Sequence, residues 1–277
     1  MNPVFLSFAG FEVRYYGLCY ALAIIIGYQI AIRDHKHWGL NKLSTDDLFD
    51  LVLFSFFGGL LGGRLYYVAF NFNHYFHSGK PWWEFLAMWH GGMAIHGALI
   101  LGPLALWVGC KIKGVSFLNV TDMWATHFLY AQALGRIGNF MNGDAHGYPT
   151  DQPWGVVFPY GPAAEEFPGI PTHPVMLYES GLNLIGWALL FKISRTHRQP
   201  GFMMCAYAIT YSLIRFFCSM FRADDLYMYG FRAPHVVSVA AIVGSLILIM
   251  GFDLAKKRIV PLKKGEKKKL NVPKAKA

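Results

Sequence analysis

Long apolar runs recur along this chain and constrain its fold more than any other feature. A helix that crosses a bilayer needs about 20 mostly apolar residues. Seven runs of about that length follow one another, at roughly 13–32, 48–70, 92–110, 118–138, 174–194, 201–221 and 234–254. Because the bilayer core offers no hydrogen bonds to the backbone, such runs must be helical. The sequence therefore predicts an all-α integral membrane protein with about seven transmembrane helices.

The charge distribution separates the chain into two parts and argues against a nucleic-acid partner. Only 15% of the residues are charged, whereas soluble globular domains carry about 25%. The net charge is +9, but residues 256–277 hold ten Lys or Arg and one Glu, which leaves residues 1–255 neutral overall. We therefore expect a polytopic membrane domain over 1–255. Residues 256–277 are predicted to form a basic, disordered cytoplasmic tail that touches anionic membrane lipids.

The basic residues also predict the orientation of the chain. Lys and Arg concentrate in alternate connections, which together with the tail hold 18 of the 25 basic residues. Those in the connections are Arg33, Lys36, Lys42, Lys111, Lys113, Lys192, Arg195 and Arg198. Cytoplasmic loops of membrane proteins carry such an excess. This pattern predicts an external N-terminus, a cytoplasmic C-terminus and a long external loop at about 139–173.

Several apolar runs contain polar groups that are costly at membrane depth and therefore indicate a functional site. On the predicted topology these groups lie near the external ends of five helices. They are Tyr16, His96, Arg136, Glu179 and Arg215. Their common depth predicts one shared cavity near the outer leaflet.

The arginines indicate the ligand of this cavity. A guanidinium group binds phosphate through two parallel hydrogen bonds, so Arg136 and Arg215 favour an anionic phospholipid headgroup. Arg64 lies nearer a helix end and is equally compatible with snorkelling to the headgroups. The four cysteines form no CxxC pair and neighbour no histidine at zinc-finger spacing, so no metal site is predicted. The residues alone leave open an enzyme, a flippase or a lipid-gated channel.

Short motifs run in order through the first six apolar runs. They are Tyr15–Leu18, Gly62–Leu65, Gly91–Gly97, Gly135–Gly143 with Gly147, His173–Glu179, and Tyr211 with Arg215–Phe217. Their identity and order resemble the phosphatidylglycerol–prolipoprotein diacylglyceryl transferase family. The resemblance covers nearly the whole chain, and Gly135–Gly143 is its most specific part.

This resemblance implies an enzyme of the bacterial inner membrane. It would transfer the sn-1,2-diacylglyceryl group of phosphatidylglycerol to the lipobox cysteine of preprolipoproteins, forming a thioether and releasing glycerol phosphate without a cofactor. His96 is implied as the base for the thiol, and Arg136 and Arg215 as the groups that stabilise the leaving phosphate. Tyr16 completes the implied catalytic set. The implied substrate-binding residues are Arg64, Arg136, Asn139, Asn142, Asp144, Gly147, Glu179 and Tyr211.

The chain departs from the family pattern at a few positions. Asp144 replaces a glutamate, Ala145-His146 replaces Leu-Trp, and Ser219 replaces an acidic residue. These departures give weight to an alternative, a divergent lipid-binding or lipid-translocating membrane protein that is not an enzyme.

Ser219 is the departure with the clearest consequence. It occupies the position four residues after Arg215, where an acid on the same helix face would pair with the guanidinium. Asp224 and Asp225 are the nearest acids, but they lie beyond that turn. We therefore expect Arg215 to lack its acidic partner at this position. If that loss weakens the orientation of Arg215, Ser219→Glu should raise turnover; if Ser219→Glu instead abolishes activity, the site is built around the serine.

Overall fold

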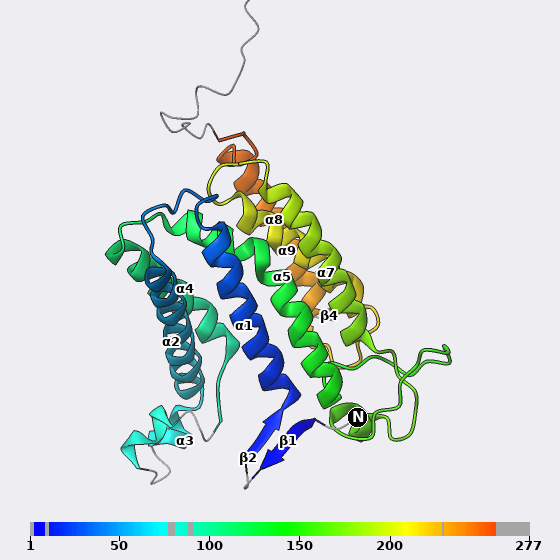
Figure 1. Cartoon of the computed structure of the whole chain (residues 1–277). Coiled ribbons are helices and arrows are strands. Elements are labelled where there is room, and N and C mark those ends of the chain that lie inside the picture. The colour runs from blue at the N-terminus through cyan, green and yellow to red at the C-terminus, as the bar shows by residue number, and fades with distance from the viewer. Residues whose placement is uncertain (1–2, 9–10, 77–80, 88–90, 229, 259–277) are drawn as a thin grey trace, which may run out of the picture.

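Long helices account for most of the structure. The computed structural model of this protein describes residues 3–8, 11–76, 81–87, 91–228 and 230–258. Within these residues, seven helices have 18 residues or more, and each lies on one of the predicted apolar runs (Figure 1). They are α1 (Tyr15–Asp34), α2 (Thr45–Phe70), α4 (Ile95–Ile112), α5 (Phe117–Asn142), α7 (Val175–Ser194), α8 (Phe202–Ser219) and α9 (Ala233–Gly251).

Among the helices of the described residues, five are long and apolar enough to cross a membrane, namely α1, α2, α4, α8 and α9. The helices α5 and α7 carry more polar side chains, and these are buried: Asp122 and His127 on α5, and Glu179 and Asn183 on α7. Because α5 and α7 pack against each other and against α8, they can bury polar groups away from lipid. The chain is therefore an α-helical integral membrane protein.

Short elements connect the long helices of this all-helical fold. Two antiparallel hairpins are present, β1 (Val4–Phe8) with β2 (Phe11–Arg14), and β3 (Tyr227–Met228) with β4 (Phe231–Arg232). Strands of two to five residues cannot be recognised by a search for apolar runs of helical length. The remaining short elements are α3 (Phe72–Phe76), the 3-10 helix η1 (Trp82–Leu86) and α6 (Pro162–Glu166).

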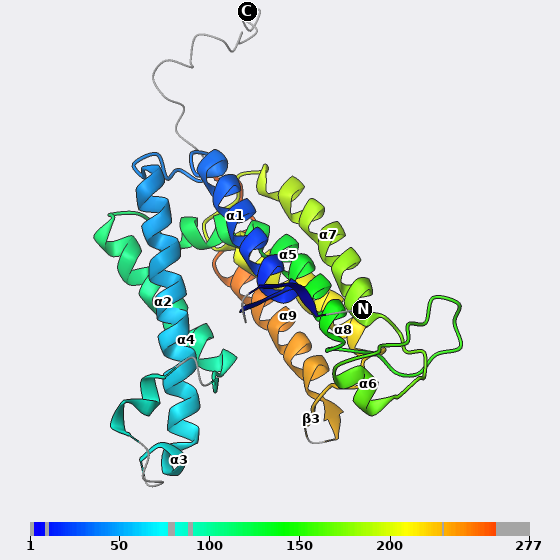
Figure 2. The same cartoon turned by 60° about the horizontal axis from the view of Figure 1, so that its bottom comes forward.

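The helices form two groups that lie side by side (Figures 1 and 2). One group is the pair α2 and α4. The other contains α5, which packs against α1, α7 and α8, with α9 packed on α8. Close contact within the α2–α4 pair depends on glycine, because a Cβ atom at Gly62 would lie 2.3 Å from the carbonyl oxygen of Gly97. Such small-residue contacts let helix backbones approach closely in a bilayer.

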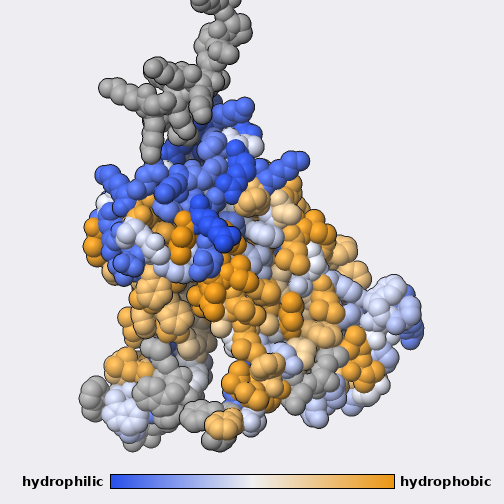
Figure 3. Space-filling view, viewed as in Figure 1, coloured by the Kyte–Doolittle hydropathy of each residue, from blue (hydrophilic) through white to orange (hydrophobic). Residues whose placement is uncertain are grey.

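Polar contacts tie the helices together at the end where α1 and α7 finish. Asp34 at the end of α1 accepts hydrogen bonds from Arg195 at 2.7 Å and from the Trp38 indole at 3.2 Å. Asp122 on α5 accepts from the backbone N–H groups of Gly201 and Met204 and thereby caps the start of α8. Figure 3 shows hydrophilic residues gathered at this end, with mostly apolar residues next to them along the helices.

The predicted tail begins at this same end. Lys257 forms a backbone bridge with Arg198, and Arg258 donates a hydrogen bond to Asn119. Residues 259–277, which make up most of the predicted disordered tail, lie outside the described residues.

The connection between α5 and α7 lies at the opposite end. It contains α6 and is held together by backbone bridges from Thr172 to Pro149 and to Val156. His146 is buried within it, 2.8 Å from the carboxylate of Glu166 on α6. The long loop predicted at 139–173 is therefore a folded segment, and it covers the ends of α5 and α7.

Candidate active site

The centre of the candidate site is the last part of α5, where the sequence reads Gly135–Gly143. This part of α5 lies at the end of the bundle that also holds α6 and the β1–β2 hairpin (Figures 1 and 2). A Cβ atom at Gly138 would lie 2.8 Å from the Tyr16 ring and 3.0 Å from the Tyr16 Cα atom. Only glycine therefore allows the start of α1 to pack this closely on α5 and to place Tyr16 at the site.

A chain of hydrogen bonds connects three of the predicted site residues on α5 and the following loop to Glu179 on α7. Arg136 donates through Nη2 to Glu179 Oε1 at 2.8 Å and through Nη1 to Asn139 Oδ1 at 3.1 Å. The amide of Asn139 in turn donates to Asp144 Oδ1 at 2.9 Å. The shorter Asp144 side chain thus still reaches the site, where burial raises the pKa of its carboxyl group.

Glu179 lies among three arginine side chains. It is fully buried, and its carboxylate is 2.8 Å from Arg136, 3.8 Å from Arg222 and 4.0 Å from Arg215. A buried carboxylate is stable only when cations and hydrogen-bond donors surround it. Glu179 therefore holds guanidinium groups from α5, α8 and the loop after α8 in one place.

The partner of Arg215 corrects the expectation drawn from Ser219. Asp225 lies 2.5 Å from Arg215 Nη2, and it also accepts a hydrogen bond from the Ser219 hydroxyl. The chain turns back after α8 ends at Ser219, which brings an acid from ten residues further along onto the guanidinium. Arg215 is therefore paired, and the loss of an acid at position 219 is compensated by the tertiary structure.

Two of the charged residues in this cluster were not singled out from the sequence. Arg222 is buried and binds Asp224 through two hydrogen bonds of 2.9 and 2.7 Å. Asp225 was noted only as lying beyond the turn of Arg215. The available signal was the grouping of three charged residues directly after an apolar run that already contained Arg215.

Two buried atoms of the cluster have no hydrogen-bond partner in the described part of the chain. They are Nη1 of Arg215 and Oε2 of Glu179. They lie 4.0 Å apart. This distance is too long for a hydrogen bond, so an acceptor such as an anionic oxygen would give Nη1 the partner that it lacks.

Three further predicted residues lie beside the cluster. Tyr211 on α8 is close enough to Arg136 and Glu179 to interact with both electrostatically. Asn142 ends α5, and its Oδ1 atom is buried with no hydrogen-bond partner among the described residues. Gly147 donates its backbone N–H to His173 and forms a backbone bridge with Arg222, which joins the loop to the end of α8.

Arg64 lies apart from this cluster. It is fully buried, and all three nitrogens of its guanidinium donate to backbone carbonyls of Glu84, Phe85, Gly91 and Gly92. These carbonyls belong to η1 and to the segment that leads into α4. Arg64 therefore holds that segment, and its buried guanidinium does not snorkel to the headgroups.

His96 is also separate from the arginines. It lies at the start of α4, is exposed, and stacks on Tyr66 with ring centroids 5.6 Å apart. No hydrogen bond or ion pair of the described residues joins it to Arg136 or Arg215. In the space-filling view an opening separates the α2–α4 pair from the β1–β2 hairpin at this end (Figure 3).

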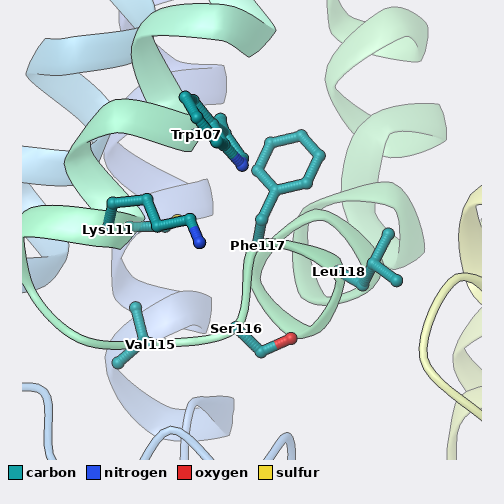
Figure 4. Close-up of a pocket in the computed structure, with 7 residues that line it drawn as sticks. Trp107, Lys111, Val115, Ser116, Phe117 and Leu118 are labelled. Atoms are coloured by element: carbon teal, nitrogen blue, oxygen red, sulfur yellow. The ribbon is translucent and has the colours of Figure 1, made fainter.

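A recess lies at the other end of the molecule. Trp107, Lys111 and Val115 line it together with Phe117 and Leu118 at the turn from α4 to α5 (Figure 4). Leu118 and Arg136 are both on α5, and the helical rise places them about 27 Å apart. This recess is therefore distinct from the arginine–carboxylate cluster.

Comparisons with known proteins identify the family of this chain. Residues 3–251 match the family described as prolipoprotein diacylglyceryl transferase. The phosphatidylglycerol–prolipoprotein diacylglyceryl transferase of Fusobacterium nucleatum is 38% identical over 90% of this chain and 97% of its own length. The corresponding protein of Gloeobacter violaceus is 38% identical over 87% and 89%, and that of Clostridioides difficile is 33% identical over 89% and 94%.

Fold and site together define a polytopic α-helical membrane protein with an arginine–carboxylate cluster buried at one end of its helices. The length and identity of the matches specify the class further. The chain belongs to the prolipoprotein diacylglyceryl transferase family, which confirms the resemblance seen in the motifs.

Proposed function

We propose that this protein transfers the sn-1,2-diacylglyceryl group of phosphatidylglycerol to the lipobox cysteine of preprolipoproteins. The observation that carries the proposal is the match to the transferase family over residues 3–251, which includes every element of the arginine–carboxylate cluster. The relatives' names state both substrates. A buried guanidinium with a free N–H in a membrane protein suits the anionic headgroup of such a lipid.

The reaction forms one C–S bond and breaks one C–O bond. The cysteine thiolate attacks the glyceryl carbon that carries the phosphate ester, and the ester oxygen leaves with the bonding electrons as glycerol phosphate. The thiol proton passes to a base. Because the phosphodiester becomes a phosphomonoester, negative charge grows on the leaving group. Guanidinium groups held in a buried site stabilise such charge more strongly than water does.

The roles in the cluster follow from its contacts. Arg215 presents Nη1 to a phosphate oxygen, while Arg136 supplies the second positive charge and is kept in place by Glu179. Tyr16 interacts with Asn139 and Asp144 and would orient the polar part of the headgroup with them. The rest of the surface that faces the headgroup would be formed by Asn142, Gly147 and Tyr211.

His96 is the proposed base for the thiol. An imidazole titrates near neutral pH, whereas a free thiol has a pKa of about 8.5 and needs a base or a positive field to react. Its exposed position at the start of α4 supports access by the peptide substrate. For Arg64 we propose a positioning role, since its donors are occupied by the backbone that leads to His96.

We further propose seven transmembrane helices, an external N-terminus and a cytoplasmic C-terminus in the bacterial inner membrane. The basic connections after α1, α4 and α7 lie at one end of the bundle, and the arginine–carboxylate cluster lies at the other. The positive-inside rule then puts the cluster near the outer leaflet. Residues 1–255 form the membrane domain, and residues 256–277 form a cytoplasmic tail that contacts anionic lipid.

The test uses the purified full-length protein with phosphatidylglycerol labelled in an acyl chain and a peptide that carries a lipobox cysteine. Transfer moves the label covalently onto the peptide and releases glycerol phosphate in equal amount. A peptide with serine in place of the cysteine is the control and should stay unlabelled. Movement of lipid between leaflets without labelled peptide would instead support the translocating alternative and refute the transferase.

A further inference from the structure

A buried carboxylate from the loop after α8 binds the guanidinium of Arg215. Asp225 Oδ1 lies 2.5 Å from Arg215 Nη2, and only 2% of the Asp225 side chain is exposed. The other carboxylate oxygen accepts a hydrogen bond from the hydroxyl of Ser219, which is fully buried. Both oxygens of Asp225 are therefore used, and a charge-assisted bond of this kind fixes both partners.

Arg222 depends on Asp225 less than Arg215 does. Arg222 Nε is 3.4 Å from Asp225, but Arg222 already has two hydrogen bonds to Asp224. By contrast, Asp225 is the hydrogen-bond acceptor of Arg215 in the described residues, since Glu179 is 4.0 Å away. The contact between Asp225 and Arg215 thus acts on the orientation of Arg215 above all.

We infer that Asp225, held by Ser219, is a positioning residue that orients Arg215 for the substrate phosphate. Asp225 binds Arg215 at Nη2, whereas Nη1 is buried without a hydrogen-bond partner among the described residues, so the carboxylate determines where Nη1 lies. A guanidinium fixed in advance loses less side-chain freedom when it binds its ligand. The inference rests on the proposed function, because it assigns a role within that reaction.

The helix geometry allows an exchange experiment. Position 219 lies four residues after Arg215 on α8, so a glutamate there can reach the same guanidinium from within the helix. Ser219→Glu alone places a second buried carboxylate against Asp225. The double variant, Ser219→Glu with Asp225→Asn, again has one carboxylate for the guanidinium of Arg215. That carboxylate now comes from α8 and no longer from the loop after it.

Four proteins are compared, the wild type, Asp225→Asn, Ser219→Glu and the double variant. Loss of a charged hydrogen bond predicts about a 10- to 100-fold lower kcat for Asp225→Asn, and a similar loss for Ser219→Glu. The double variant should recover to within about fivefold of the wild type. Asp253→Asn is the matched control, because Asp253 pairs with Lys256 at the other end of the molecule and is exposed. It should keep its activity.

The double variant also lacks the Ser219 hydroxyl, so its activity cannot depend on the native hydrogen bond between Ser219 and Asp225. Recovery would therefore show that a carboxylate beside Arg215 is needed, which separates positioning from a purely structural role. A double variant no better than the single ones, or an Asp225→Asn variant with unchanged kcat, would overturn the inference. Binding of fluorescent phosphatidylglycerol to the four proteins is measured in parallel and should follow the same order. If the wild type binds this lipid but transfers nothing, the proposed function fails while the binding order still tests the role of Asp225. Equal lipid binding by all four proteins would then reject the positioning role of Asp225.

Discussion

Replacing Arg136 by lysine removes the guanidinium fork of this residue but keeps its positive charge. Arg136 contacts two partners in different directions, with Nη1 on Asn139 Oδ1 and Nη2 on Glu179 Oε1. A lysine ammonium is a compact charge on a flexible stem and has no fork of this geometry. We expect it to stay with the buried Glu179 and to lose Asn139, which in turn holds Asp144.

The size of the effect follows from the bond that is lost. A hydrogen bond to a charged group contributes about 1.5–3 kcal/mol, and about 1.4 kcal/mol corresponds to a factor of ten in rate. Arg136→Lys should therefore lower turnover by about 10- to 150-fold. Arg136→Ala also removes the charge beside the leaving phosphate, and removal of such a donor costs up to about 10³-fold by itself. The alanine variant should be nearly inactive.

The assay measures label transferred from phosphatidylglycerol to the lipobox peptide per folded protein. Arg195→Lys is the matched control, because Arg195 pairs with Asp34 at the opposite end of the bundle, and it should stay within about twofold of the wild type. Full activity of Arg136→Lys would show that the fork is not needed and would refute the phosphate-binding scheme. An equal loss in Arg195→Lys would show that the effect is not specific to the site.

Four further predictions test other parts of the scheme. His96→Gln should lower turnover by about 10²–10⁴-fold, with a loss that shrinks as the pH rises toward the thiol pKa; a small, pH-independent loss would contradict its role as the base. Burial raises the pKa of Asp144, so the folded protein should lose stability as the pH rises through that pKa. The gain in Tm from Asp144→Asn should therefore be larger at pH 8 than at pH 4, and an equal gain at both would refute this. Deletion of residues 263–277 should leave activity in detergent within a few-fold, and complete loss would assign the tail a further task. Reporter fusions within 150–170 should be external and those within 192–198 cytoplasmic; the reverse would separate the site from its external peptide.

The structure also revises the prediction for position 219. The spacing of Arg215 and Ser219 along α8 by itself predicts that Ser219→Glu raises turnover, by returning an acid to Arg215. Asp225 already provides that acid, and a second buried carboxylate beside it is unfavourable. The substitution should therefore lower activity unless Asp225 is neutralised at the same time.

The amino-acid sequence by itself determined the helices and their motifs. Each long apolar run forms a helix. The hydrogen bonds of a helix join residues four apart, so a run can form its helix without a partner from a distant part of the chain. It also placed Arg136 and Glu179 at one end of the protein, since their depth follows from their place within a run. Burial of α5 and α7 inside the bundle explains why these two helices could be less apolar than the others.

The tertiary structure decided which side chains meet. The partner of Arg215 comes from a loop that turns back after α8, and the four carbonyls that bind Arg64 come from a segment 20 to 28 residues away. Neither contact follows from helical spacing. Ion pairs between elements depend on how backbones far apart in the sequence approach each other, and that approach is set by packing such as Tyr16 on Gly138. For this reason motifs could identify the charged residues of the site, while only the folded chain could pair them.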